Sequence, residues 1–240
     1  SMLDLVEGGS SYEEILQLGL ALCEAGVSIM KTGIGWHEAQ IPTIATKVPR
    51  AAFTWVTAKF RDQLPVPVVT SNRINTPEVA EDILSRGDAD MVSMARPLLA
   101  DAEFVIKAEQ NRADEINTCI ACNQACLDHV FNGQLTSCLV NPRACYELDL
   151  NIEVSETKKN IAVIGAGPAG LAAAVTAAQR GHNVSLFDSA ETIGGQFNLA
   201  KRIPGKEEFN ETIRYFQRQL EIHNIDVKLG QRVTTQQLNE

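Results

Sequence analysis

The fold is decided by residues 160–170, which read Asn-Ile-Ala-Val-Ile-Gly-Ala-Gly-Pro-Ala-Gly. The first half is a short apolar run typical of a buried strand, and the second half is a glycine turn that opens an alanine-rich helix over residues 171–180. Gly181 ends that helix, and residues 184–188 form a second apolar run. This order of strand, helix and strand predicts a parallel βαβ unit.

The glycine turn has the spacing of a dinucleotide-binding loop. Its glycines allow a tight turn, a close approach of the backbone to a pyrophosphate, and close packing of helix on strand. The pyrophosphate would lie at the helix N-terminus, where free N–H groups and the helix dipole favour an anion. Asp188 follows at the end of the next strand, where a carboxylate accepts hydrogen bonds from ribose hydroxyls. The predicted cofactor residues are Gly165, Ala166, Gly167, Pro168, Ala169, Gly170 and Asp188.

The loop alone does not distinguish FAD from NAD(P). A second glycine pair, Gly194 and Gly195, follows Asp188 closely and precedes Gln196. This arrangement resembles the two-dinucleotide flavoproteins, in which the first Rossmann unit binds FAD. The resemblance implies FAD here, with Gly195 and Gln196 as further cofactor contacts, although Gln196 also fits an ordinary loop amide.

The first 112 residues alternate apolar runs with amphipathic helical patterns. Thr76 is expected to cap a helix that has Pro77 in its first position and ends before Gly87. The alternation predicts βα units with parallel strands that are covered on both faces. We expect strands at residues 27–31, 66–70 and 89–94, and helices at 11–25, 51–63 and 77–86.

The composition excludes several classes of protein. Lys plus Arg number 21 against 30 Asp plus Glu, so the formal net charge is −9, and 45% of the 240 residues are hydrophobic. The chain is therefore neither disordered nor a basic nucleic-acid binder. No apolar run reaches the roughly 18 to 20 residues that span a bilayer, so no membrane partner is expected. The N-terminal residues do not resemble a signal peptide, which favours a cytoplasmic location.

Five of the six cysteines fall between Cys119 and Cys145. In a cytoplasmic protein such a group favours metal binding over disulfides. Four of them have the spacing Cys119-x2-Cys122-x3-Cys126-x11-Cys138, which suits a zinc ion and an iron–sulfur cluster equally well. Their position between a flavin-type domain and a barrel-like segment favours the cluster, because an electron relay is useful there. Cys145 and Cys23 are expected to be buried structural residues.

These motifs, in this order, resemble bacterial NADPH-dependent 2,4-dienoyl-CoA reductase, a family related to trimethylamine dehydrogenase and the old yellow enzymes. The resemblance covers essentially the whole chain. It rests on Gly-Ile-Gly-Trp-His-Glu at 33–38, Thr-Ser-Asn-Arg at 70–73, Met-Ala-Arg-Pro-Leu-Leu-Ala-Asp at 94–101, the spaced cysteines and the loop at 165–170.

The resemblance implies an α/β fold in three parts. Residues 1–112 would be the C-terminal half of an FMN-binding TIM barrel, 113–157 the cluster loop, and 158–240 the first part of a Rossmann-type FAD domain. A TIM barrel needs about 250 residues. We therefore expect the chain to be an internal piece of a larger enzyme, whose NADPH site lies outside these residues.

Site residues also follow from the resemblance. Arg73, Ala95 and Arg96 would bind FMN, and they follow strands whose loops commonly form a phosphate site in TIM barrels. Arginine suits a phosphate through its planar fork of donors. His37 would be catalytic, helping a tyrosine outside this chain to protonate the substrate. The four spaced cysteines would hold a 4Fe–4S cluster.

The implied function is an oxidoreductase that passes electrons from NADPH through FAD and the cluster to FMN, which reduces 2,4-dienoyl-CoA in fatty acid β-oxidation. Its partners would be the acyl-CoA substrate and the rest of its own polypeptide. Two alternatives stay open. One is a related flavin/iron–sulfur enzyme, such as an amine dehydrogenase or an enoate reductase, and the other is a zinc-bridged scaffold without enzyme activity.

Overall fold

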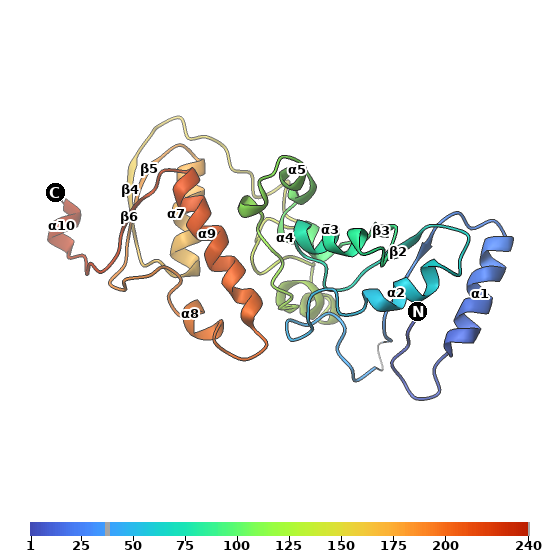
Figure 1. Cartoon of the computed structure of the whole chain (residues 1–240). Helices are drawn as coiled ribbons and strands as arrows, with labels where there is room; N and C mark the ends of the chain where they lie inside the picture. Colours follow the sequence, from blue (N-terminus) through green and yellow to red (C-terminus); the bar gives the residue numbers. More distant parts are fainter. Residues whose placement is uncertain (37–38, 240) are drawn as a thin grey trace.

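The computed structural model describes residues 1–36 and 39–239. Two three-stranded parallel sheets lie at opposite ends of the molecule, and the cysteine-rich segment lies between them (Figure 1). The predicted α/β class and the parallel pairing are both confirmed. The first sheet has the order β1 (Met30–Lys31), β2 (Val68–Thr70), β3 (Met91–Val92), and the second has the order β4 (Asn160–Ile164), β5 (Asn183–Phe187), β6 (Asp226–Lys228).

Two of the three helices of the first unit begin where the sequence predicts, and the third begins three residues later than predicted. Ser11 accepts a hydrogen bond from the Glu14 N–H and completes a capping box at α1 (Tyr12–Glu24). Thr76 caps α3 (Pro77–Ser85) by accepting from the Val79 N–H. The third helix of this unit is α2 (Thr54–Arg61), whose Val56 and Phe60 are buried against β2.

The strands of the first sheet are shorter than predicted. Pairing starts only at Pro67, whose carbonyl accepts the Met30 N–H, because two prolines at 65 and 67 have no N–H to donate. The expectation that both faces are covered is also wrong for the outer strands. All of β2 is buried, but Met91 in β3 is 49% exposed.

Short helices fill the middle of the chain. They provide the turns that bring the cysteines together, as described below. In order they are α4 (Arg96–Ala100), α5 (Phe104–Glu109), the 3-10 turn η1 (Ala113–Glu115), the π-helical turn η2 (Gln124–Asp128) and α6 (His129–Phe131).

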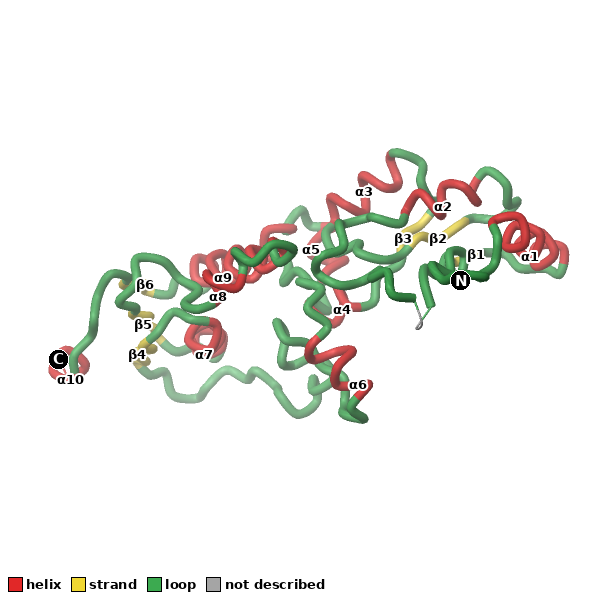
Figure 2. The backbone as a smooth tube through the Cα atoms, turned by 90° about the horizontal axis from the view of Figure 1, so that it is seen from below, coloured by secondary structure: helices red, strands yellow, loops and turns green. Residues whose placement is uncertain are grey.

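The second unit contains the predicted βαβ arrangement. The helix α7 (Pro168–Gln179) connects β4 to β5, and α8 (Phe197–Ala200), the 3-10 turn η3 (Glu207–Phe209) and α9 (Asn210–Ile222) lead to β6 and then α10 (Thr235–Asn239). Figures 1 and 2 place α7 and α9 side by side on one side of the sheet. Their buried contacts with the sheet form a core of Leu171, Ala174, Leu186 and Leu220. The other side of the sheet is open, since Ile164 is 56% exposed.

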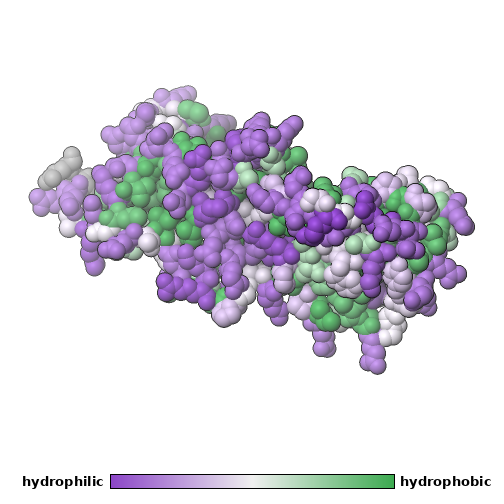
Figure 3. All heavy atoms as spheres, viewed as in Figure 1, coloured by the Kyte–Doolittle hydropathy of each residue, from purple (hydrophilic) through white to green (hydrophobic). Residues whose placement is uncertain are grey.

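Apolar side chains are exposed at both ends of the molecule, as the green areas of Figure 3 show. In the first unit they include Leu18, Trp36 and Trp55, and in the second unit Leu199 is 67% exposed. Apolar surface of this kind is typical of regions that other protein segments cover. None of the described helices is long and apolar enough to cross a membrane.

We expect Gly170→Ala to destabilise the second unit. A Cβ at this position would lie 1.8 Å from the Gly165 carbonyl oxygen, a backbone atom that cannot move aside as the end of a flexible side chain could. The cost should reach about 3 kcal/mol, the upper range for forced overpacking. Thermal unfolding of the full-length protein, stripped of bound nucleotides, measures this. Gly167→Ala is the control, because its Cβ would meet nothing within 4 Å, and equal melting temperatures for the two variants would contradict the prediction.

Candidate functional site

The glycine loop is built to present backbone N–H groups to a ligand. Gly165 has a φ of +107°, which L residues with side chains rarely adopt, and Gly167 forms the N-cap of α7 without a side chain that caps it. The N–H groups of the first helical turn are therefore free to bind an anion. The second glycine pair packs on this loop: the Gly194 N–H donates to the Ala166 carbonyl at 2.7 Å, and a Cβ on Gly195 would lie 3.0 Å from Gly167 Cα.

Asp188 ties the end of β5 to the glycine loop. Its Oδ2 accepts a hydrogen bond from the Ala166 N–H at 2.6 Å, and its Oδ1 accepts one from the Ala190 N–H at 2.8 Å. A carboxylate has about four acceptor sites, and these two hydrogen bonds leave the others available. Hydrogen bonds from ribose hydroxyls to Asp188 stay a prediction. Gln196, with an exposed side chain, lies at the start of α8.

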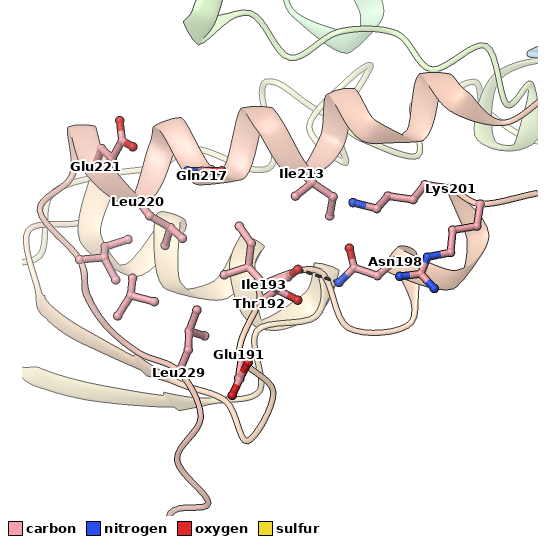
Figure 4. A pocket seen from close by; sticks show the side chains of 13 residues that line it. Glu191, Thr192, Ile193, Asn198, Lys201, Ile213, Gln217, Leu220, Glu221 and Leu229 are labelled. Carbon is pink, nitrogen blue, oxygen red and sulfur yellow. Dashed lines mark hydrogen bonds between the residues drawn. The ribbon is translucent and has the colours of Figure 1, made fainter.

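One large cavity lies apart from the predicted dinucleotide site. It measures about 630 Å³ and lies between α9 and residues 191–202, with Ile213, Leu220 and Leu229 on its apolar wall. Figure 4 shows the Asn198 amide across the cavity mouth, donating to the Ile193 carbonyl at 2.8 Å. None of the predicted cofactor residues lines this cavity, and the sequence reasoning missed it.

A second cavity, of about 220 Å³, lies at the carboxyl ends of all three strands of the first sheet. Lys31 ends β1, residues 71–75 follow β2, and residues 93–97 follow β3, so the predicted Arg73, Ala95 and Arg96 are brought together. We call this cavity the strand-end pocket. Parallel α/β sheets bind ligands at this edge.

The loop after β2 is held in an unusual conformation. Asn72 and Arg73 have φ values of +74° and +57°, both in the left-handed region. Such residues cost of order 1–3 kcal/mol each, and they persist only where the surroundings over-determine them. The surroundings of this loop are therefore part of the site.

The guanidinium of Arg73 pairs with a protein carboxylate. Arg73 is 4% exposed; its Nε donates to the Val48 carbonyl at 2.8 Å, and its Nη2 donates to Glu208 Oε1 at 2.6 Å. A direct contact from Arg73 to a phosphate stays a prediction, since its fork is turned toward Glu208. The sequence reasoning missed Glu208, which lies in η3 of the second unit.

Arg96 lies between the strand-end pocket and the cysteines. Its Nη1 donates to the Ile44 carbonyl at 3.1 Å and to the Asn123 side-chain oxygen. Arg96 and Cys119 line both the strand-end pocket and the neighbouring pocket that contains the cysteines. The two pockets therefore share one wall.

The four spaced cysteines line that neighbouring pocket. Cys126 lies in η2, and the Ser137 N–H donates to the Ala125 carbonyl at 2.8 Å, which brings Cys138 alongside. Their other neighbours are apolar and include Leu99, Ile120, Leu139 and Val140. We call it the cysteine pocket.

A zinc ion and an iron–sulfur cluster both stay predictions for the cysteine pocket. Among the described residues, no group of three or more His, Cys, Asp or Glu side chains is close enough to hold one ion. A cubane cluster needs its four thiolates further apart, because they bind four different iron atoms. Burial raises the pKa of the Cys119 and Cys122 thiols and that of Cys138 to about 11, so ligand binding here would release protons.

The other site residues are placed as follows. Cys145 is exposed, so the prediction that it is buried is wrong; it lies in a turn with a φ of +65°, where no neighbouring helix or strand covers it. Cys23 is half-buried and packs against the core of the first unit. The predicted catalytic His37 lies outside the described residues.

Two protein families match this chain. Residues 1–115 match the NADH:flavin oxidoreductase / NADH oxidase family, and residues 159–239 match the pyridine nucleotide-disulphide oxidoreductase family. Both matched families consist of oxidoreductases, so each half of the chain is similar to a different part of a flavin- or nicotinamide-dependent enzyme. The two families agree with the predicted flavin and nicotinamide cofactors, and the iron–sulfur cluster stays a prediction.

Relatives match over most of the chain. It is 41% identical over 206 residues to a metal reductase of Desulforamulus reducens (86% of this chain, 31% of the relative). It is 35% identical over 231 residues to an NADH oxidase of Thermoanaerobacter brockii (95% and 35%). Other matches carry the names of amine dehydrogenases and of reductases.

A solved structure of 2-naphthoyl-CoA reductase with 2-naphthoyl-CoA superimposes with a TM-score of 0.94 at 33% identity, over 98% of this chain and 36% of that one. The chain thus spans about a third of the length of these relatives.

We expect Asp188→Ala to loosen the glycine loop. The substitution removes two hydrogen bonds from backbone N–H groups to a charged acceptor, each worth about 1.5–3 kcal/mol. The full-length protein should then retain less FAD per chain and melt at a lower temperature. The exposed Glu191, three residues further along the chain, provides the control Glu191→Ala. Wild-type FAD content in Asp188→Ala would contradict this assignment.

Proposed function

We propose that this chain is the electron-transfer core of a cytoplasmic oxidoreductase that takes electrons from NADPH and reduces a conjugated acyl-CoA, with 2,4-dienoyl-CoA as the first candidate. The shared wall between the strand-end pocket and the cysteine pocket carries the proposal. FAD, a 4Fe–4S cluster and FMN, when bound, would supply two-electron and one-electron transfer. The NADPH and most of the substrate contacts would come from the rest of the polypeptide.

The residues of each site fit the group assigned to it. The glycine loop offers uncapped N–H groups and no side chain at Gly167, which suits the pyrophosphate of FAD. The strand-end pocket has cationic Lys31 and Arg96 at the carboxyl ends of parallel strands, which suits the phosphate of FMN.

Four thiols in an apolar pocket suit an iron–sulfur cluster. The side chains of Cys119, Cys122, Cys126 and Cys138 would be its ligands. Apolar neighbours such as Leu139 and Val140 would exclude water from it. Since burial disfavours the free thiolates, the cluster's positive iron atoms would be needed to stabilise the charge of the ligands.

Two likenesses support the proposed substrate class. The motif at 33–38 resembles the dienoyl-CoA reductases, and the superimposable structure is that of a reductase bound to another acyl-CoA. In such a thioester the carbonyl withdraws charge from the conjugated chain. His37 would help to place the acid that protonates that chain.

A second candidate function is favoured by the names of other relatives. A cinnamate reductase matches 98% of this chain, and a dimethylamine dehydrogenase matches 65% of it. An amine dehydrogenase or an enoate reductase would use the same electron carriers, and the described residues do not include the contacts that choose a substrate.

The proposed activity is tested on the full-length protein. Its visible spectrum should contain flavin and iron–sulfur absorbance, and NADPH should bleach it under anaerobic conditions. Addition of a 2,4-dienoyl-CoA should then restore the oxidised spectrum, whereas trimethylamine or cinnamate should not. A colourless protein would reject the proposal, and reoxidation by cinnamate or reduction by trimethylamine alone would favour the second candidate.

The cluster is tested separately by Cys126→Ser. Loss of one thiolate ligand should lower iron and acid-labile sulfide to well below half of the wild-type content per chain, measured by elemental analysis. The exposed Cys145 provides the matched control, and Cys145→Ser should keep the wild-type content. Zinc in place of iron, with no labile sulfide, would instead support the scaffold hypothesis.

A further inference from the structure

Glu208 is a buried carboxylate at the junction of the two units. Its side chain is 9% exposed, and it belongs to the turn η3 that precedes α9. All of its side-chain partners come from the first unit. Arg50 donates to both oxygens at 2.7 and 2.6 Å, Arg73 donates to Oε1 at 2.6 Å, and the Asn75 amide donates to Oε2 at 3.1 Å.

These four hydrogen bonds satisfy the carboxylate completely. An ionised carboxylate has about four acceptor sites, and each oxygen here accepts two bonds. Burial raises the pKa of Glu208, but the hydrogen bonds and charges of Arg50 and Arg73 outweigh it, so the pKa lies below its ordinary value. A buried charge is tolerated only with partners of this quality. Removal of this charge alone would leave Arg50 and Arg73 without their shared buried partner.

The same carboxylate holds the strand-end pocket. Arg73 and Asn75 both line that pocket, while Glu208 does not. The Asn75 Nδ2 also donates to the Cys119 carbonyl at 2.9 Å, so one amide joins Glu208 to the wall of the cysteine pocket. The strained backbone at Asn72 and Arg73 needs an external restraint, and the Arg73–Glu208 pair provides it.

We propose that Glu208 is a positioning residue for the strand-end pocket: it fixes Arg73 and Asn75, and so makes FMN binding in the first unit depend on the docking of the second. This inference rests on the proposed function only in taking FMN as the ligand of that pocket. Glu208 itself does not touch the ligand. It acts through the loop after β2, whose conformation sets where the backbone N–H groups of residues 72–75 point.

The test uses Glu208→Gln in the full-length protein. The glutamine amide has the same size as the carboxylate, but one oxygen becomes an NH₂ group. That donor would face the guanidinium donors of Arg50 and Arg73, so hydrogen bonds are lost. The dissociation constant of FMN, measured by flavin fluorescence after FMN removal, should rise at least about tenfold, as expected when one charge-assisted hydrogen bond is lost. FAD and iron content should stay at the wild-type level. Glu207→Gln is the matched control, because Glu207 precedes Glu208 directly and is exposed.

The outcomes separate the inference from the proposed function. Wild-type protein without FMN would reject the function, whereas a Glu208→Gln protein with the wild-type FMN dissociation constant would overturn the inference alone. Equal losses of FMN, FAD and iron would also overturn it, because they would indicate general unfolding. If Glu208→Gln does not accumulate, Arg50→Gln removes two of the four bonds and leaves Arg73 paired. A several-fold weaker FMN affinity is then expected, and an unchanged affinity overturns the inference.

Discussion

The burial of one carboxylate, Glu208, between two α/β units is the constraint on which the rest of this structure depends. A charge at that position must keep its arginine partners, and those partners come from the other unit. The ion pairs of Glu208 therefore hold the two units against each other. The segment that carries the cysteines lies between these units. A third arginine also joins the second unit to the rest of the chain: Arg214 in α9 donates to the carbonyls of Asp114 and Ile116 at 2.5 and 2.6 Å.

Local chemistry explains most of what the sequence predicts correctly. The helix starts at Ser11 and Thr76 depend on side chains within three residues of the cap, and the glycine loop depends on six adjacent residues. Strand lengths depend on pairing with distant segments, so they were less well predicted. A strand of the first sheet exists only where β2 lies beside it, and the prolines before β2 delay that pairing.

Long-range contacts were not predictable in the same way. Arg73 and Glu208 are 135 positions apart, and each has a simpler local interpretation. Arg73 follows a strand of the barrel segment, where an arginine suits a phosphate. Glu208 lies just before α9, where a carboxylate complements the helix dipole. The structure brings Arg73, Ala95 and Arg96 to one pocket, and their binding of FMN stays a prediction. The sequence contained no signal for the carboxylate that holds Arg73. Cys145 was misjudged for the same reason, since exposure is decided by neighbours that the local sequence does not name.

The shared wall of the strand-end and cysteine pockets has an energetic consequence. Arg96 and Cys119 face both pockets, and electrostatic interactions are weakly screened where water is excluded. An electron that arrives on a group in one pocket would therefore alter the reduction potential of a group in the other. The two midpoint potentials would then be thermodynamically linked, and Arg96 is a side chain through which a substitution would reach both.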